Sequence, residues 1–290
     1  MNTRAPLRFE AMASPWEIHL PGARAGLRET VAAAVLGEVR RLEHKYSRYR
    51  DDSVVQQINR AGGQAVTVDE ETARLIDYGA LLWQQSGGRF DLTSGVLRRV
   101  WRFGPGAALP EPEAVAALRP LIGWERVQWS GQRLQMPAGM ELDFGGIGKE
   151  YAVDRALAIA VRLDPGPVLI NGGGDLAASA PPAPDEHWRV GLDNGFGLAA
   201  PGLQLRQGAV ATSGIARRHL QSGSRRYGHL LDPRSGWPVA DAPLAVTVLA
   251  GSCSEAGAQA TLALLHGAGA RGYLQAQGVE HWVHEAAAGG

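Results

Sequence analysis

The chain has 290 residues, of which 45% are hydrophobic and 20% charged, and its 29 basic residues balance 29 acidic ones. This composition is typical of a globular protein, and the balanced charge argues against nucleic-acid binding, which normally needs a basic excess. No apolar run is long enough to cross a membrane, no hydrophobic signal segment follows the N-terminus, and the single cysteine, Cys253, excludes an internal disulfide. We therefore expect a cytoplasmic protein.

Helices are predicted where apolar residues recur every three to four positions. They are expected over residues 27–46, 54–59, 70–86, 112–119, 149–163 and 254–266. Asp69 is placed to cap the third of these helices. Strands are expected over residues 8–20, 127–129, 133–136, 141–144, 167–170, 188–192, 203–206, 209–212, 244–249 and 281–284. The three strands between 127 and 144 are expected to form an antiparallel meander.

These elements alternate without a regular strand–helix–strand rhythm, which favours the α+β class over a doubly wound parallel sheet. A chain of this length can bury a sizeable core. We expect one domain over residues 1–290, with mixed or antiparallel sheets and packed helices. The Ala- and Gly-rich end after about residue 285 is expected to be frayed.

The segment 226–238 is the most informative about function. It is predicted to place His229 on a short strand, followed at once by a rigid turn that would fix Asp232 in relation to the histidine. Just upstream, a strand ends in Thr212 and Ser213. Hydroxyl donors near a side chain that titrates around neutrality suit a site that handles phosphate groups. The alternative is a hairpin whose histidine is satisfied by a backbone carbonyl.

Two glycine-rich segments suit anion binding. In the first, residues 87–95, backbone N–H groups can cradle an anion while Asp91 and Thr93 fix a polar ligand edge, although a helix C-cap followed by an N-cap explains the same pattern. The second, residues 142–154, reads as a strand, a glycine turn and a helix start that aims Lys149 at a phosphate. The only other lysine is Lys45.

Neither segment has the spacing of a P-loop. The glycine-rich stretch 171–175 also lacks the spacing of a dinucleotide-binding fingerprint between a strand and a helix. Dinucleotide binding of the Rossmann kind is therefore disfavoured.

Seven segments, taken in chain order, form a specific set. They are AMASPW at 11–16, YSRYRDDS at 46–53 with Asn59, GRFDLT at 88–93, LDFGGIGK at 142–149, INGGGD at 170–175, ATSG at 211–214, and the His229 segment. No single motif is decisive, but their order from about Phe9 to Gly267 resembles the ApbE-type FAD:protein FMN transferases.

The resemblance implies a compact α+β fold around a deep FAD cleft. It also implies a reaction in which the FMN half of FAD moves to a threonine or serine hydroxyl of a target protein, releasing AMP with the help of Mg²⁺. Met12, Tyr49, Phe90, Asp91 and Asp143 match positions that contact FAD in the family.

The same resemblance bears on the charged and hydroxyl side chains. Lys149 and a metal ion would stabilise charge on the pyrophosphate, where we also expect Thr212 and Ser213. His229 is a suitable base for the target hydroxyl. The partners expected are thus FAD and a flavin-acceptor protein.

The implied metal site departs from the family pattern. The family binds the ion through a backbone carbonyl at the position of Gly146 and through an Asp and a Thr four residues apart on one helix. This chain keeps Thr261 but has Gly257 in place of the Asp, and Glu255 points to a different side of the helix. One carboxylate fewer predicts weaker Mg²⁺ binding, and Gly257→Asp is expected to tighten it.

Two smaller departures lie elsewhere. Ala13 replaces the usual Gly after Met12, and Glu150 replaces the Gly after Lys149. Glu150 is expected to add negative charge close to the phosphate position.

Two other functions remain open. The first is an FAD-binding protein that stores or senses flavin after losing efficient catalysis, as the change at Gly257 suggests. The second is a pyrophosphatase that splits FAD into FMN and AMP with water. The fate of FAD in the presence of Mg²⁺ separates an enzyme from a binder. Covalent FMN on a protein threonine separates a transferase from a hydrolase.

Overall fold

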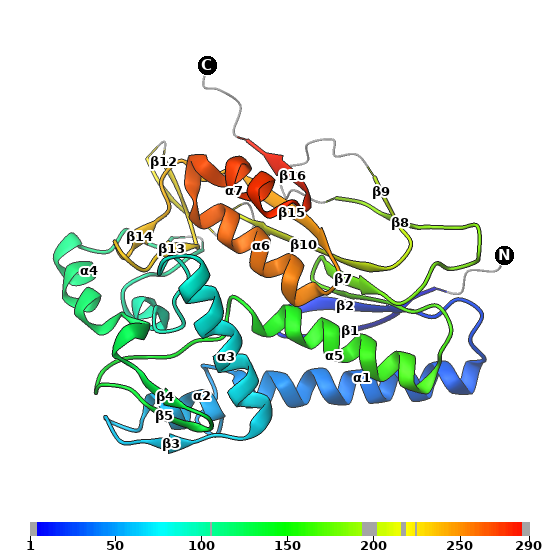
Figure 1. The fold of residues 1–290 in the computed structure, drawn as a ribbon, viewed down its shortest axis with the longest axis horizontal. Coiled ribbons are helices and arrows are strands. Elements are labelled where there is room, and N and C mark those ends of the chain that lie inside the picture. Colours follow the sequence, from blue (N-terminus) through cyan, green and yellow to red (C-terminus); the bar gives the residue numbers. More distant parts are fainter. Residues whose placement is uncertain (1–4, 105, 193–201, 216–218, 224, 286–290) are drawn as a thin grey trace.

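An antiparallel sheet forms the centre of the molecule (Figure 1). The computed structural model describes residues 5–104, 106–192, 202–215, 219–223 and 225–285. In spatial order the seven strands of the sheet are β1 (Leu7–Ala11), β2 (Ser14–His19), β6 (Leu169–Gly172), β7 (Asp175–Ala178), β10 (Gly208–Gly214), β15 (Ala245–Ala250) and β16 (Glu280–His284). Every neighbouring pair in this order is antiparallel.

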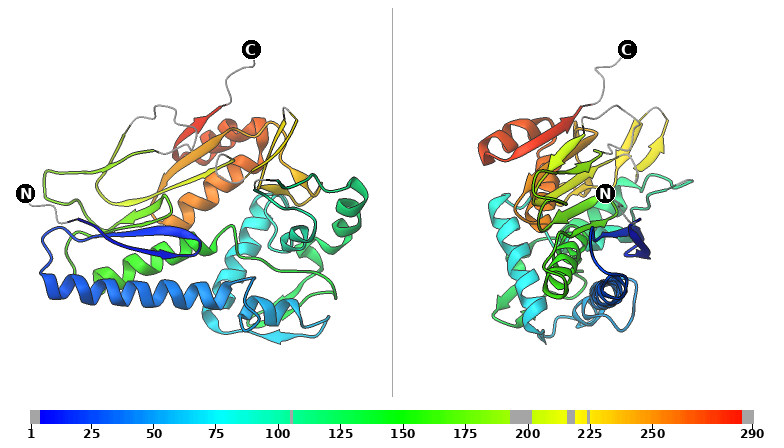
Figure 2. Two further views of the ribbon diagram at one scale, coloured as in Figure 1. Left: turned by 180° about the vertical axis from the view of Figure 1, so that it is seen from behind. Right: turned by 90° about the vertical axis from the view of Figure 1, so that its right-hand side faces the viewer.

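Four helices pack in a row beside this sheet. They are α1 (Ala25–Tyr46), α5 (Gly148–Leu163), α6 (Cys253–Leu265) and α7 (Ala270–Gln277). Helix α1 packs on α5, α5 on α6 and α6 on α7, and both views of Figure 2 place α1 and α7 at opposite ends of the row. Helix α5 also packs against β6 and β7, and α6 packs against β10 and β15. One face of the sheet is therefore covered by α5 and α6.

Alternation along the strands divides the buried side chains between the two faces of the sheet. Ile170 and Ala177 belong to the main core with α5, whereas Leu169 and Leu176 pack on the opposite face. The short strands β8 (Trp188–Val190) and β9 (Leu203–Leu205) cover that opposite face. The central strands of the sheet are thus buried on both faces.

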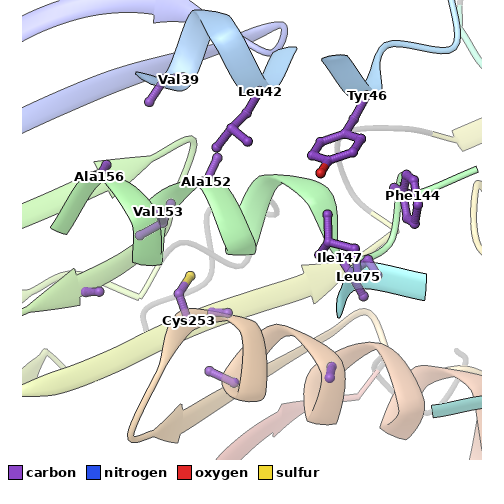
Figure 3. Close-up of a cluster of buried hydrophobic side chains, with 14 of the residues drawn as sticks. Val39, Leu42, Tyr46, Leu75, Phe144, Ile147, Ala152, Val153, Ala156 and Cys253 are labelled. Atoms are coloured by element: carbon purple, nitrogen blue, oxygen red, sulfur yellow. The ribbon is translucent and has the colours of Figure 1, made fainter. Parts of the chain in front are cut away.

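Helix α5 is enclosed by its neighbours because its buried positions carry small side chains. Figure 3 shows Ala152 directed toward Leu42 of α1, while Cys253 lies on the side of α6 that faces α5. Ala152, Val153 and Cys253 are completely buried. Small residues here let the three helices approach closely, which fixes where α5 begins relative to the sheet.

A second group of elements lies at one end of the sheet. It consists of α2 (Val54–Asn59), α3 (Glu70–Gln85), α4 (Pro112–Leu118), the 3₁₀ turns Gly95–Arg99, Arg119–Leu121 and Trp124–Arg126, and a small antiparallel sheet of β3 (Val66–Thr67), β5 (Arg133–Gln135) and β4 (Gln128–Ser130). Two hairpins are formed by β11 (His219–Ser222) with β12 (Arg225–Gly228) and by β13 (Leu231–Asp232) with β14 (Trp237–Pro238). A further 3₁₀ turn, Gly267–Gly269, joins α6 to α7.

The predicted α+β class is confirmed, and the predicted helices lie within two residues of those observed. The Asp69 cap is also confirmed, since its carboxylate accepts a hydrogen bond from the Thr72 N–H. The predicted frayed end, residues 286–290, lies outside the described residues. The single domain stays a prediction. Among the described helices, none is long and apolar enough to span a bilayer.

Three expectations about strands were wrong. Residues 141–144 form no strand beyond one isolated bridge between Glu141 and Ser94, and the third strand of the small sheet is instead β3. Strand β12 ends at Gly228, so His229 follows the strand rather than lying on it. The strand expected over residues 8–20 is instead the hairpin of β1 and β2, which turns at Met12 and Ala13. Strand β7 and helix α7 were not predicted.

Candidate functional site

The start of helix α5 brings Lys149 to the sheet. Its ammonium pairs with the carboxylate of Asp175 on β7 and lies 3.5 Å from the Gly172 carbonyl oxygen. The other carboxylate oxygen of Asp175 accepts a hydrogen bond from the Thr212 N–H at 3.0 Å. Asp175 thus joins α5 to β10 through one buried carboxylate. The glycine turn, the helix start and the end of β10 are held together by this contact.

Lys149 keeps its charge in this position. Burial works to lower the pKa of Lys149, but the attraction of Asp175 and Glu150 outweighs burial and raises it. About a quarter of the side chain remains accessible to solvent, since its exposed fraction is 28%. The ammonium is therefore a fixed positive charge at the N-terminus of a helix, where an anion is favoured.

The two predicted hydroxyls at the end of β10 face opposite sides of the sheet, because adjacent residues of a strand alternate. The Thr212 hydroxyl hydrogen-bonds to the hydroxyl of its cross-strand partner Thr247, with 2.8 Å between the oxygens. The Ser213 hydroxyl lies 3.0 Å from the hydroxyl of Thr261 on α6. Only Ser213 thus shares the helix-covered face with Lys149.

Glu150, the residue after Lys149, turns away from it toward α6. It is buried, and a Cβ atom added at Gly257 would lie 2.5 Å from its Cγ atom. Burial, and secondarily the charge of Asp175, raises the pKa of Glu150 to about 7. The Glu150 side chain fills the space between the two helices, and the expectation that it adds negative charge close to the phosphate position stays a prediction.

A second polar group lies on the loop after α1. The Arg48 guanidinium pairs with the Asp143 carboxylate and donates a hydrogen bond to the Tyr49 hydroxyl at 2.9 Å. Asp143 also accepts from the Gly145 N–H at 3.0 Å, so it organises the glycine turn. Tyr49 is 78% exposed, and the Arg48 guanidinium lies over its ring at 5.1 Å from the centroid.

Met12 lies in the tight turn between β1 and β2. Met12 and Ala13 both have positive φ, 51° and 53°, as a two-residue type I′ hairpin turn requires. The Met12 N–H donates to the carboxylate of Glu43 on α1 at 2.6 Å. This contact holds the turn against the helix.

Phe90 and Asp91 follow α3 and are buried. The Phe90 ring packs on Gly146, where an added Cβ would lie 2.9 Å from the ring. The Asp91 carboxylate accepts hydrogen bonds from the Thr93 N–H and hydroxyl, at 2.7 and 2.6 Å, and from the Trp124 N–H at 2.9 Å. Asp91 is only 6% exposed and its acceptor sites are used within the protein, so it anchors the loop at 123–124.

His229 is exposed and lies just after β12. Its ring meets that of Phe103 edge to face, with centroids 6.4 Å apart. The Asp232 carboxylate accepts hydrogen bonds from the Arg234 N–H at 2.9 Å and from its guanidinium at 2.6 Å. Asp232 is therefore held by Arg234, and its fixed relation to His229 stays a prediction.

A model of the ApbE family matches residues 12–283. The chain belongs to the ApbE family. An ApbE relative from Klebsiella pneumoniae, named FAD:protein FMN transferase, is 31% identical over 230 residues, which cover 76% of this chain and 71% of that protein. A protein of the same name from Treponema pallidum is 29% identical over 241 residues, which cover 75% of this chain and 66% of that protein. The family is one of enzymes.

Solved ApbE structures share the fold. The ApbE protein of Thermotoga maritima has a TM-score of 0.87 at 28% identity, and the alignment covers 96% of this chain and 93% of that one. The apo form of the flavinyl transferase ApbE from Pseudomonas stutzeri has a TM-score of 0.84 at 27% identity, covering 96% and 90%. Mixed helices and antiparallel sheets are common to all three chains.

Within this ApbE fold, the predicted residues fall into separate groups. Lys149, Ser213 and Thr261 lie on the helix-covered side of the sheet. Tyr49 and Asp143 both contact Arg48. Phe90 packs on Gly146 in the glycine turn. Met12 lies in the turn between β1 and β2, and His229 follows β12. The deep FAD cleft and the ligand roles of these residues stay predictions.

Three polar partners were missed as site residues. Arg48 and Asp175 lie inside motifs that the sequence analysis quoted, so their presence in those motifs was the available signal. Thr247 had no such signal, because its role depends on the register of β10 with β15. Each of the three pairs with a predicted site residue.

Within the described part of the chain, no three His, Cys, Asp or Glu side chains converge as a ready-made metal site. Thr261 lies one helical turn after Gly257 on α6, and Gly146 lies in the turn before α5. Glu255 is exposed whereas Gly257 is buried, which confirms that Glu255 points to another side of the helix.

Proposed function

We propose that this protein transfers the FMN part of FAD to a serine or threonine hydroxyl of an acceptor protein and releases AMP. The names of its ApbE relatives support FAD as the substrate. The observation that carries the proposal is the Lys149 ammonium, which Asp175 holds at the start of α5 beside the glycine turn. A fixed cation at the N-terminus of a helix is complementary to a pyrophosphate.

The reaction needs a nucleophile, a base and a way to stabilise negative charge. The acceptor oxygen forms a bond to the FMN phosphorus while the bond from that phosphorus to the bridging oxygen breaks. His229 takes the hydroxyl proton, and AMP leaves with the bridging oxygen. Lys149 stabilises the charge that develops on the pyrophosphate oxygens.

The face of α6 that carries Thr261 fits a hard divalent cation, since it lies against the Ser213 hydroxyl and against Glu150, whose buried carboxylate oxygen has no partner in the described structure. Thr261 and the Gly146 carbonyl are the residues proposed to hold Mg²⁺. When bound, the ion would neutralise charge on the pyrophosphate.

The test is to incubate the purified protein with FAD, Mg²⁺ and a bacterial protein extract as the source of acceptor. Chromatography measures AMP and free FMN, and in-gel fluorescence measures covalently bound flavin. AMP together with fluorescent protein supports the proposal. AMP with an equal amount of free FMN indicates the pyrophosphatase, and tight FAD binding without AMP indicates the flavin-binding protein.

Lys149→Gln tests the role of the ammonium. It should weaken FAD binding and slow AMP release, because it removes the charge that faces the pyrophosphate. Lys45→Gln is the matched control, since it removes the only other lysine, on α1, where Lys45 pairs with Asp69 and Glu71. A melting curve of each variant checks that loss of function does not reflect unfolding. Equal AMP release by the Lys149 variant would contradict the proposed role.

A further inference from the structure

The carboxylate of Glu150 is buried between α5 and α6. It takes no part in the proton transfer proposed for His229 or in the charge stabilisation proposed for Lys149. Only 9% of the residue is exposed. Its Oε2 atom is buried and, among the described residues, has no hydrogen-bond partner. A buried carboxylate oxygen without a partner costs free energy unless a ligand satisfies it. The position therefore calls for a positively charged or hydrogen-bonding ligand.

Gly257 makes this placement of Glu150 possible. A Cβ atom at position 257 would lie 2.5 Å from Cγ of Glu150, 3.2 Å from Cδ and 3.3 Å from Oε1. Carbon atoms that are not bonded do not approach as closely as 2.5 Å. A side chain at 257 and this conformation of Glu150 are thus mutually exclusive. The Glu150 carboxylate occupies the space that a side chain on α6 would otherwise fill.

Lys149 does not satisfy this carboxylate, although it is the next residue along the chain. Its ammonium pairs with Asp175 and lies near the Gly172 carbonyl oxygen. Adjacent residues of a helix point about 100° apart, so Lys149 faces the sheet while Glu150 faces α6. The positive charge beside Glu150 is therefore already engaged.

The face of α6 that Glu150 packs against also carries a hydroxyl group. Thr261 is four residues after Gly257, hence on the same face of α6, and is 7% exposed. Its hydroxyl lies 3.0 Å from the hydroxyl of Ser213 on β10. The buried Cys253 thiol, one turn before Gly257, also faces α5. A carboxylate and two hydroxyls are the kind of oxygen donors that Mg²⁺ and Mn²⁺ prefer.

We propose that the carboxylate missing from α6 at position 257 is supplied by Glu150 from α5, and that Glu150 and Thr261 bind a divalent cation between the two helices. The inference rests on the proposed function, because the FAD pyrophosphate would complete the coordination. Mg²⁺ is usually held by one or two carboxylates together with substrate phosphate and water. The changes at 150 and 257 are then one exchange rather than two separate losses.

The first experiment measures Mn²⁺ binding by electron paramagnetic resonance, with and without FAD, and needs no turnover. Glu150→Gln keeps the shape of the side chain and removes its charge, and it should weaken Mn²⁺ binding by tenfold or more. Glu255→Gln, on the exposed side of α6, is the matched control and should bind as the unmodified protein does. Equal binding by Glu150→Gln, or no binding by the unmodified protein under either condition, overturns the proposal.

A second set of variants moves the carboxylate back to α6. Glu150→Gly should lose Mn²⁺ binding, and Glu150→Gly combined with Gly257→Asp should regain it. Gly257→Asp alone should lower the melting temperature, because its side chain overlaps Glu150. This result would reverse the expectation from sequence that the single change tightens the site. A folded double variant that fails to regain binding overturns the proposal.

Metal binding and AMP release are measured separately, so the two proposals can fail independently. Mn²⁺ binding that depends on Glu150, in a protein that releases no AMP from FAD, supports the cation site and rejects the proposed activity. AMP release that depends on metal, with Mn²⁺ binding unaffected in Glu150→Gln, supports the activity and rejects the cation site.

Discussion

The side-chain amide of Asn59 pairs with both backbone groups of Leu142. Its Nδ2 donates to the Leu142 carbonyl oxygen at 3.0 Å, and its Oδ1 accepts from the Leu142 N–H at 2.7 Å. Leu142 has no strand partner, so one amide at the end of α2 replaces the ladder that a neighbouring strand would provide. Asp143, the next residue, organises the glycine turn before α5. Asn59 therefore supports the site from a distance.

Asn59→Ala should lower the free energy of unfolding by about 1–3 kcal/mol, because two backbone groups lose their partners at a buried residue. Chemical denaturation measures the change. Gln57→Ala is the control, since Gln57 lies on the same helix but is exposed, and it should change stability by less than about 0.5 kcal/mol. Equal effects of the two substitutions would show that the amide pair contributes nothing.

The long helices could be predicted because each buries one stripe of side chains. Val31, Val35, Val39 and Leu42 are all completely buried along α1, as their spacing indicated. Residues 141–144 misled for the same reason. Met140, Leu142 and Phe144 are apolar and buried at alternate positions, as in a strand, but the hydrogen-bonding partner of Leu142 is a side chain. Apolar patterning reports burial, and it does not report which group completes the hydrogen bonds.

The site could be predicted only in part. Lys149, Ser213 and Thr261 were recognised from motifs, but the pairing of Lys149 with Asp175 depends on β7 lying between β6 and β10. The order of strands in a sheet is a long-range property that local spacing does not encode. The direction of Glu150 could have been derived, because helix geometry separates it from Lys149. Its packing on Gly257 required the position of α6.

The hairpin turn at Met12 and Ala13 carries removable strain. Alanine at a φ of 53° costs about 1–2 kcal/mol relative to glycine, and the greater freedom of glycine in the unfolded chain offsets part of this. Ala13→Gly should therefore stabilise the protein by about 1 kcal/mol. Ala33→Gly, at an exposed position within α1, should destabilise it by about 1 kcal/mol. Denaturation midpoints that move in the same direction would contradict this explanation.

The Glu71 carboxylate should make stability depend on pH in the acid range. The pKa of Glu71 is lowered from 4.5 to about 2, mainly by hydrogen bonds from Arg41 and then by those from Lys45. Together these outweigh burial, which acts to raise the pKa. A group with a lowered pKa stabilises the folded state above its unfolded pKa, and this contribution is lost as the pH falls toward 2. In melting curves between pH 7 and pH 2.5, Glu71→Gln should show a smaller loss of stability than the unmodified protein. Glu70→Gln, at the exposed start of α3, should follow the unmodified protein.

His229 is the residue whose removal should separate binding from chemistry. If it is the base, His229→Ala leaves the Lys149 pair and the Arg48 pair intact, so FAD should bind with little change. AMP release with an acceptor present should fall by roughly two to four orders of magnitude, because proton removal by a positioned base contributes that much to the rate. His44→Ala, on the surface of α1, is the control. Turnover that survives in His229→Ala would assign the proton to another group, and a matched loss of FAD affinity would make His229 a binding residue.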